Sequence, residues 1–279
     1  MTTQEARTPD DINPQYATLT DASIEILGGT MHVGYWHDEN DDASMEEATQ
    51  RLTDMVIDKV NPEPGQRLLD VGCGNGTPAV RMVQTRDVTV TSIDIGAYQL
   101  QLTNALVSSS GLSDKITVQY GNVDEMTFPD SSFDHAWSSE CLIHVPNWTE
   151  SLRNIARVLR PGGRLVVTDC VERAPVDAET RAFLDNYYAT VHCHYNKLSE
   201  IKGQVEAAGL ELVELLEVGD HILKRTMRAV DDGFRARAAA IEEKSGMPAD
   251  VTSGIGADAV RFSELPEAGY AIVVAQKPL

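Results

Sequence analysis

Basic residues are scarce in this chain. Its 279 residues include 23 Lys and Arg against 43 Asp and Glu, which gives a net charge of −20 at pH 7. Proteins that bind a phosphate backbone need clustered Lys and Arg to displace counterions, and anionic membranes attract basic segments in the same way. The composition therefore argues against a nucleic-acid partner and against a membrane partner. The acidic surface is most simply explained as a well-solvated one.

Paired cysteines and long apolar runs are also absent from the sequence. The four cysteines, Cys73, Cys141, Cys170 and Cys193, form no C-x-x-C pair, so we expect reduced thiols and no metal site. No apolar run approaches the roughly 18 residues that a membrane-spanning helix requires. The first residues, M-T-T-Q-E-A-R-T-P-D-D, have neither the basic nor the apolar region of a signal peptide. We therefore expect a cytoplasmic protein.

A glycine-rich turn is the most informative motif that the sequence does contain. Residues 67–77 read R-L-L-D-V-G-C-G-N-G-T, which predicts a buried strand, a turn at Gly72, Gly74 and Gly76, and a helix that begins at about Thr77. Glycines let a ligand approach the backbone closely, and the N–H groups at a helix start attract negative charge. The spacing differs from the G-x-G-x-x-G fingerprint and therefore argues against NAD and FAD.

Strand and helix patterns alternate after this turn, which predicts an α/β fold with a doubly wound, mostly parallel sheet of seven strands and helices on both faces, a Rossmann-like arrangement. Strands are predicted at 67–71, 88–94, 116–121, 133–138, 164–171, 210–218 and 269–278. Helices are predicted at 16–27, 45–59, 77–86, 97–110, 148–159, 178–196, 198–210 and 221–245, the second capped by Ser44 and Glu47.

Three parts of the chain follow from this pattern. Residues 1–60 are expected to form an N-terminal helical lid, and residues 61–175 the core of the sheet. Residues 176–279 carry the last two strands, together with about fifty residues before the final strand that the core does not need. We interpret that extra length as a helical cap over the carboxyl ends of the strands, where caps of this kind determine substrate selectivity.

Ligands of such sheets bind beyond the carboxyl ends of the strands, so the residues there are the first site candidates. Asp94 ends the second strand about twenty residues after the glycine turn, the place where a carboxylate accepts hydrogen bonds from a ribose diol. The alternative role for Asp94 is a loop acid or a helix cap. His144 follows the fourth strand and Asp169 lies near the end of the fifth.

These motifs, in this order, resemble the class I S-adenosylmethionine (SAM)-dependent methyltransferases, whose motif I has the form D-V-G-C-G-x-G. The segments M-H-V-G-Y-W, F-P-D-S-S-F-D, A-R-V-L-R-P-G-G and L-P-E-A-G-Y narrow the resemblance to the bacterial natural-product methyltransferases of the rebeccamycin sugar O-methyltransferase type. The resemblance covers most of residues 30–172 and the last strand. It implies that SAM is the cofactor and that residues 61–175 bind it.

The resemblance also assigns cofactor-binding positions. They are Asp70, Gly72 and Gly74 in motif I, Asp94 for the ribose, Asn122 and Val123 for the adenine, Glu140 beside the donor methyl group, and Tyr35 and Trp36 over the methionine end. The family usually has Asp where this chain has Asn122, whose amide oxygen can still accept the adenine amino group.

Two residues are candidates for catalysis. The family associates two adjacent histidines and a later aspartate with general-base chemistry, and here Ile143 replaces the first histidine. A neutral His144 could remove the proton from an attacking hydroxyl, with Asp169 orienting it or holding a second substrate hydroxyl. The alternatives are that His144 packs over the cofactor and that Asp169 caps a loop amide.

The cap segment supplies candidates for contacts with the acceptor, the molecule that receives the methyl group. These are Tyr187, Tyr188, His192 and Tyr195, although for each of them taken singly ordinary packing is the better explanation. His192 and His194 have no acidic or Cys partner pattern, so we reject a metal there. The resemblance also admits a homodimer, although the sequence shows no interface.

Three functions remain open from the sequence. The leading one is a SAM-dependent methyltransferase of a small molecule, with O-methylation ahead of N- or C-methylation. The second is a cyclase that keeps the fold and the cofactor site without transferring methyl, because fold does not fix the reaction. The third, a cofactor-binding regulator or scaffold, would need an exposed apolar patch, for which the sequence gives no sign.

Overall fold

The computed structural model describes residues 14–279. In this part of the chain the strands form one sheet of eight, in the spatial order β3-β2-β1-β4-β5-β8-β7, with the short β6 paired to β5. The strands are β1 (Arg67–Val71), β2 (Thr89–Asp94), β3 (Ile116–Tyr120), β4 (His135–Ser139), β5 (Arg164–Glu172), β6 (Asn196–Lys197), β7 (Glu211–Glu217) and β8 (Ala268–Gln276). The sheet is parallel except for β8, which runs antiparallel to both β5 and β7.

The predicted α/β fold and the seven long strands are confirmed. The eighth strand, β6, was not predicted: its two residues lie at the end of the segment 178–196, which was expected to be helical throughout, whereas the helix ends at Val191. The division into domains at 60 and 175 stays a prediction, since one hydrophobic cluster contains residues of all three parts.

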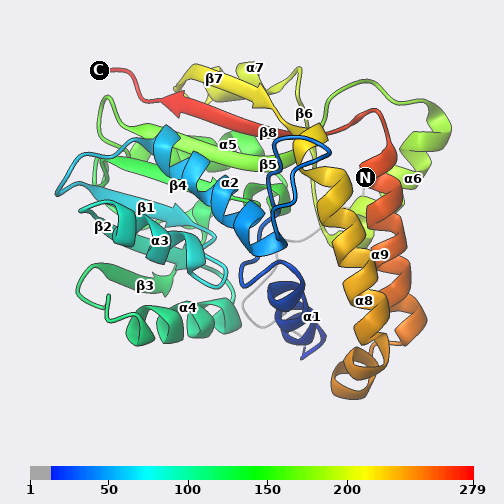
Figure 1. The fold of residues 1–279 in the computed structure, drawn as a ribbon. Helices are drawn as coiled ribbons and strands as arrows, with labels where there is room; N and C mark the ends of the chain where they lie inside the picture. The colour runs from blue at the N-terminus through cyan, green and yellow to red at the C-terminus, as the bar shows by residue number, and fades with distance from the viewer. Residues whose placement is uncertain (1–13) are drawn as a thin grey trace.

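Helices cover both faces of the sheet (Figure 1). They are α1 (Pro14–Ile26), α2 (Met45–Val60), α3 (Thr77–Thr85), α4 (Ala97–Ser109), α5 (Trp148–Val158), α6 (Ala178–Val191), α7 (Ile201–Ala207), α8 (Leu223–Ser245) and α9 (Ala249–Glu264), with short 3₁₀ turns η2 (Val123–Glu125), η3 (Leu142–His144) and η4 (Gly219–His221). The helix α9 was not predicted separately from α8.

The two faces follow from the alternation of side chains along each strand. Leu68 packs in a cluster with buried residues of α2, α3, α4 and α9, whereas its neighbour Leu69 packs with α5 and α7. Both leucines are fully buried, and each such side chain stabilises the fold by about 1.5–3 kcal/mol. The predicted capping box is present, because Ser44 and Glu47 satisfy each other's backbone N–H groups at the start of α2.

The helices α1, α8 and α9 lie beyond the carboxyl ends of the parallel strands (Figure 1). Ala22 of α1 packs with Phe234 and Ile241 of α8 in a small separate hydrophobic cluster. The sheet therefore has helices on its faces and a further group of helices beside the edge where a ligand is expected. No helix in the stretch 14–279 combines the length and the apolar character needed to cross a bilayer.

Candidate active site

A cavity of about 380 Å³ lies at the carboxyl ends of β1, β2 and β4. The residues that line it come from the turns after four strands, from the segment before α2 and from the loop after α6. They are Thr30, Met31, His32, Asp70, Gly72, Cys73, Gly74, Asn75, Pro78, Asp94, Ile95, Gly96, Gln99, Asn122, Asp124, Trp137, Ser139, Glu140, Cys141, Ile143, His144, Val145, Pro146, His192 and His194.

The glycine turn forms one wall of this cavity and requires glycine for two reasons. Gly72 has φ +75° and Gly74 has φ +56°, a region that L-residues with a Cβ rarely adopt. A Cβ on Gly72 would also lie 2.2 Å from Sγ of Cys141, and one on Gly74 would lie 3.2 Å from Sδ of Met31. The turn is therefore packed closely on both sides, with its backbone facing the cavity.

Asp94 lies at the end of β2, against the glycine turn. Its carboxylate accepts hydrogen bonds from the backbone N–H of Gly96, at 2.8 Å, and of Gly74, at 3.1 Å. Burial raises the pKa of Asp94 while these N–H groups lower it. The side chain lines the cavity and also holds the loop at the start of α4, so both roles considered from the sequence are compatible with its position.

Asp70 is buried beneath the turn at the end of β1. It accepts a hydrogen bond from the Ser92 hydroxyl at 2.9 Å. Burial raises the pKa of Asp70 to about 7, and the nearby charge of Asp94 adds to the effect. The cavity floor therefore carries a carboxyl group whose charged form is disfavoured by burial.

The predicted adenine residues occupy different places. Asn122 lines the cavity, and its side-chain oxygen accepts the N–H of Asp124 at 3.0 Å. Asp124 lines the cavity as well, whereas Val123 is buried and outside the lining. A direct side-chain contact of Val123 with the base is therefore not supported by this geometry.

The segment 28–36 lies over the glycine turn. The carbonyl oxygen of Gly29 accepts hydrogen bonds from Nδ2 of Asn75, at 2.8 Å, and from Oγ1 of Thr77, at 3.1 Å. These contacts bring Thr30, Met31 and His32 to the cavity. The sequence pointed to Tyr35 and Trp36 of this segment but not to these three residues, whose only signal was their position three to five residues before Tyr35.

Tyr35 and Trp36 lie on the other side of the same segment. The Tyr35 ring stacks on His221, with centroids 5.1 Å apart, and the indole N–H of Trp36 donates to the Ala43 carbonyl at 3.0 Å. Neither ring lines the cavity, so the predicted cofactor contacts of Tyr35 and Trp36 are not supported by this geometry. Their apolar surfaces pack between α2 and α8 instead.

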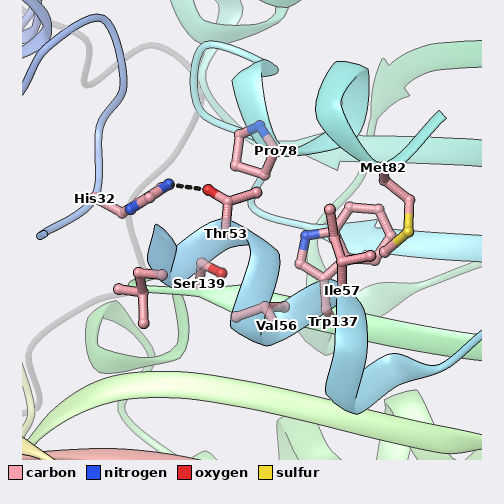
Figure 2. Close-up of a pocket in the computed structure, with 9 residues that line it drawn as sticks. His32, Thr53, Val56, Ile57, Pro78, Met82, Trp137 and Ser139 are labelled. Atoms are coloured by element: carbon pink, nitrogen blue, oxygen red, sulfur yellow. Dashed lines mark hydrogen bonds between the residues drawn. The ribbon is translucent and has the colours of Figure 1, made fainter. Parts of the chain in front are cut away.

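A second, much smaller cavity of about 10 Å³ lies behind the first, between α2, the start of α3 and the end of β4 (Figure 2). His32 and Thr53 meet at its edge, with Nε2 2.8 Å from the Thr53 hydroxyl. Nδ1 of His32 lies 3.0 Å from the Val33 carbonyl and must donate to it. Because burial lowers the pKa of His32, the ring is neutral and Thr53 donates to Nε2. The space suits one water molecule.

Glu140 follows β4 and lines the cavity. One carboxylate oxygen, Oε1, accepts the backbone N–H of Val33 at 3.0 Å and the hydroxyl of Tyr270 at 2.8 Å. Burial raises the pKa of Glu140 to about 7, although both hydrogen bonds favour the charged form. Glu140 therefore lies at the cavity, and Val33 and Tyr270, which are far from it in the sequence, hold its carboxylate.

Three of the histidines that line the cavity come from the loops after β4 and after α6. His144, in η3, places Nδ1 3.0 Å from the backbone oxygen of His192. The N–H of His194 donates to the Ile143 carbonyl at 2.6 Å. The loops 141–146 and 192–195 are thus joined, and His192 and His194 both line the cavity with His144. In the described residues no group of three His, Cys, Asp or Glu is arranged to hold a metal ion.

Asp169 is placed differently from the prediction. It is 4% exposed and does not line the cavity. Its carboxyl group faces the backbone N–H of Ile143, which favours the charged form, although neither oxygen reaches ideal hydrogen-bond geometry with a partner among residues 14–279. Burial raises the pKa of Asp169 well above its usual range, and the charge of Glu140 raises it further. A hydrogen bond to a substrate hydroxyl is therefore not supported, and the observed partner of the His144 ring is a backbone oxygen.

The predicted tyrosines of the cap are packing residues in this structure. Tyr187, Tyr188 and Tyr195 surround Phe262 of α9 in an aromatic cluster, with Tyr188 and Tyr195 centroids 4.3 Å apart. The Tyr188 hydroxyl donates to Glu172 at 3.1 Å. None of the three tyrosines lines the cavity. Of the predicted acceptor contacts only His192 lies there.

Comparison with known proteins agrees with this geometry. A family model described as a methyltransferase domain matches residues 69–167. The 27-O-demethylrifamycin SV methyltransferase of Amycolatopsis mediterranei is 34% identical over 272 residues, which cover 97% of this chain and 98% of that protein. The chain belongs to the class I SAM-dependent methyltransferases. The O-methyltransferase resE of Aspergillus sclerotiorum is 32% identical over 97% of this methyltransferase and 98% of its own length.

A solved structure gives a second comparison. The crystal structure of the [4+2]-cyclase SpnF is similar to this methyltransferase with a TM-score of 0.85 and 27% sequence identity, over 98% of this chain and 97% of that one. The shared fold therefore extends through the helices that follow the core, and this fold accommodates a reaction other than methyl transfer.

SAM is the cofactor of this methyltransferase, and the residues of the cavity fit it. Gly72 and Gly74 line the cavity with no side chain of their own, so a ligand can approach their backbone closely. Asp94 and Asn122 offer acceptor oxygens to a nucleoside, and Asp70 and Glu140 offer carboxylates to a cationic ligand. We refer to the part of the cavity lined by these residues as the cofactor end, and to the part lined by His144, His192 and His194 as the acceptor end.

Proposed function

We propose that this methyltransferase transfers a methyl group to a hydroxyl oxygen of a small natural product, with His144 as the general base. The observation that carries the proposal is the position of His144 on the cavity, with Nδ1 3.0 Å from the backbone oxygen of His192. The names of two relatives support oxygen as the methylated atom, since one acts on a 27-O-demethyl compound and the other is an O-methyltransferase.

The contact with His192 determines which nitrogen of His144 is basic. A carbonyl oxygen can only accept, so Nδ1 carries the proton, an assignment from the hydrogen bond rather than an observation of the hydrogen. In the neutral ring Nε2 is then the basic nitrogen. It would remove the proton of a substrate hydroxyl as that oxygen attacks, a contribution of about 10²–10⁴-fold to the rate.

SAM, when bound, supplies a methyl group on a positively charged sulfur, and the protein aligns the attacking oxygen with it. The loops at 141–146 and 192–195 surround that oxygen with imidazole rings and with the apolar side chains of Ile143, Val145 and Pro146. Alignment and exclusion of water then provide the larger part of the acceleration.

The lining also bears on the acceptor. Among the described residues that line the cavity there is no Lys or Arg, whereas four are Asp or Glu. An acceptor with a phosphate or carboxylate near its reacting atom would be repelled and unpaired there. We therefore propose an uncharged hydroxylated acceptor, such as a polyketide or terpenoid. A cytoplasmic location and a homodimer remain predictions.

A cyclase function is the second candidate, and the similarity to SpnF at 27% identity favours it. In that case the cavity would hold SAM as a structural ligand, and the histidine end would fold a polyene substrate. The two candidates differ in their demand for a base, because cyclisation by bond reorganisation removes no proton and would not need Nε2 of His144.

Mass spectrometry with methyl-deuterated SAM separates the candidates. The protein is incubated with 27-O-demethylrifamycin SV, with other hydroxylated polyketides and with a metabolite extract from the organism that encodes the protein. We expect a product that carries one labelled methyl group, which fragmentation places on oxygen. An unlabelled, isomerised product would support the cyclase, and a label on carbon or nitrogen would overturn O-methylation.

A further inference from the structure

The last strand of the sheet reaches the cofactor end of the cavity through one side chain. Tyr270 lies in β8, which is paired along its length with β5 and β7. Its relative exposure is 0%. The phenol hydroxyl donates a hydrogen bond to Oε1 of Glu140 at 2.8 Å, across 130 residues of sequence. Through this contact a residue of the last strand reaches a residue that lines the cavity.

The same oxygen of Glu140 holds the segment over the cofactor. The backbone N–H of Val33 donates to Oε1 at 3.0 Å, across 107 residues of sequence. Val33 directly follows Thr30, Met31 and His32, the residues of this segment that line the cavity. One carboxylate oxygen therefore fixes the segment 28–36 relative to the sheet, and the Tyr270 hydroxyl fixes that oxygen.

The backbone of Glu140 shows that its position is imposed by these contacts. It has φ +52°, a conformation that costs a residue with a side chain about 1–3 kcal/mol and persists only where the surroundings hold it. Its N–H donates to the Thr168 carbonyl at 2.7 Å. The carboxylate is buried, and the two donors on Oε1 favour its charged form.

We propose that Tyr270 is a positioning residue for the cofactor: through Oε1 of Glu140 it holds Val33, and with it residues 30–32, against the bound SAM. Tyr270 does not line the cavity itself. Removing its hydroxyl leaves Glu140 with one donor on Oε1, so the carboxylate can turn away from Val33. The segment then opens more often, and the cofactor leaves faster.

The structure offers a matched control for this proposal. Tyr188 is also buried and also donates its hydroxyl to a buried glutamate, Glu172, at 3.1 Å. Neither Tyr188 nor Glu172 lines the cavity. The variants Tyr270→Phe and Tyr188→Phe each remove one hydroxyl that donates to a buried glutamate, and each should lower the stability of the fold.

The experiment measures dissociation of S-adenosylhomocysteine (SAH) from the two variants by stopped-flow fluorescence. We expect Tyr270→Phe to speed dissociation about tenfold, the effect of losing about 1.4 kcal/mol, and Tyr188→Phe to leave the rate within about twofold. Equal rates for the two variants would overturn the proposal. KM for SAM should rise in Tyr270→Phe while kcat at saturating SAM changes little, a split that a general loss of stability does not produce.

Hydrogen exchange provides a readout that depends on neither the cofactor nor the acceptor. In the cofactor-free protein, Tyr270→Phe should increase exchange of backbone amides in residues 30–36, whereas Tyr188→Phe should not. Unchanged exchange there would overturn the proposal even if SAH left faster. SAH dissociation and hydrogen exchange do not involve methyl transfer, so a failure of the proposed O-methylation would leave these two measurements interpretable.

Discussion

The two ends of the cavity are built in different ways. At the cofactor end the wall is formed by the backbone of the glycine turn after β1. Asp94, which follows Gly74 by twenty residues in the sequence, accepts the N–H of that glycine. At the acceptor end the wall is side chains from two loops, joined by contacts between Ile143 and His194 and between His144 and His192. The cofactor end depends on one short sequence motif, whereas the acceptor end depends on a contact between His144 and His192, which lie 48 residues apart in the sequence.

The difference predicts which measurements each end should affect. A change at the glycine turn alters a surface that the cofactor needs, so it should appear in cofactor affinity. A change in the histidine loops leaves that surface intact and should appear in kcat or in KM for the acceptor. Four experiments test this division.

Replacement of His144 has the largest expected effect. In His144→Ala the base is lost, so kcat should fall about 10²–10⁴-fold, while the calorimetric dissociation constant of SAH stays near that of the wild type. His37→Ala, which removes an exposed histidine outside the cavity lining, is the control. A fall in kcat within about twofold would remove His144 from the base role.

Replacement of Gly72 comes next. Gly72→Ala combines a positive φ with a Cβ 2.2 Å from Sγ of Cys141, whereas at Gly65, with φ +84°, a Cβ would have no neighbour within 4 Å. Both variants pay the conformational cost of about 1–2 kcal/mol, but only Gly72→Ala adds about 1–3 kcal/mol of overpacking. Chemical denaturation and SAH calorimetry measure the difference. Similar losses in both variants would show that close packing at the turn is unimportant.

The pH dependence of cofactor binding should be smaller. Burial raises the pKa values of Asp70 and Glu140 to about 7, so raising the pH from 6 to 8 ionises both carboxyl groups. SAM carries a positive sulfonium that these charges attract, and its affinity should increase about tenfold over this range. SAH lacks that charge and should show a shallower dependence in calorimetry. Equal slopes for the two ligands would contradict this account.

Asp169→Asn should have the smallest effect, and a favourable one. The folded-state pKa of Asp169 is raised by burial, so the wild-type protein loses stability as the pH rises from the unfolded-state value of about 4. The amide does not titrate, and the variant should gain about 1 kcal/mol over the wild type between pH 5 and pH 8. Urea unfolding at the two pH values tests it. A large fall in kcat instead would restore the predicted orienting role.

The contrast between the two ends also explains what the sequence could predict. The strand ends and the glycine turn were predictable because strand alternation and positive-φ glycines leave local patterns. The partner of His144 was not, because it is a backbone oxygen in a loop whose approach depends on how α6 ends at His192, a residue with φ +55°. No side-chain pattern encodes that contact.

Aromatic residues were the least predictable. Tyr35, Trp36, Tyr187, Tyr188 and Tyr195 were all candidates for ligand contact, and all pack outside the cavity lining. Large rings supply much of the buried apolar area of any domain, and the same residue types also bind ligands. Only the tertiary arrangement decides between these roles, as it does where Met31, rather than an aromatic side chain, approaches Gly74.

The place of β8 in the sheet has a consequence for biosynthesis. This strand lies between β5 and β7 but follows both in the chain, so during translation each of them presents an unpaired edge until Ala268–Gln276 has left the ribosome. Exposed edges of this kind pair with other chains and attract chaperones. A nascent chain stalled before Ala268 would therefore be prone to aggregation, and it would lack the tyrosine that completes the cofactor site.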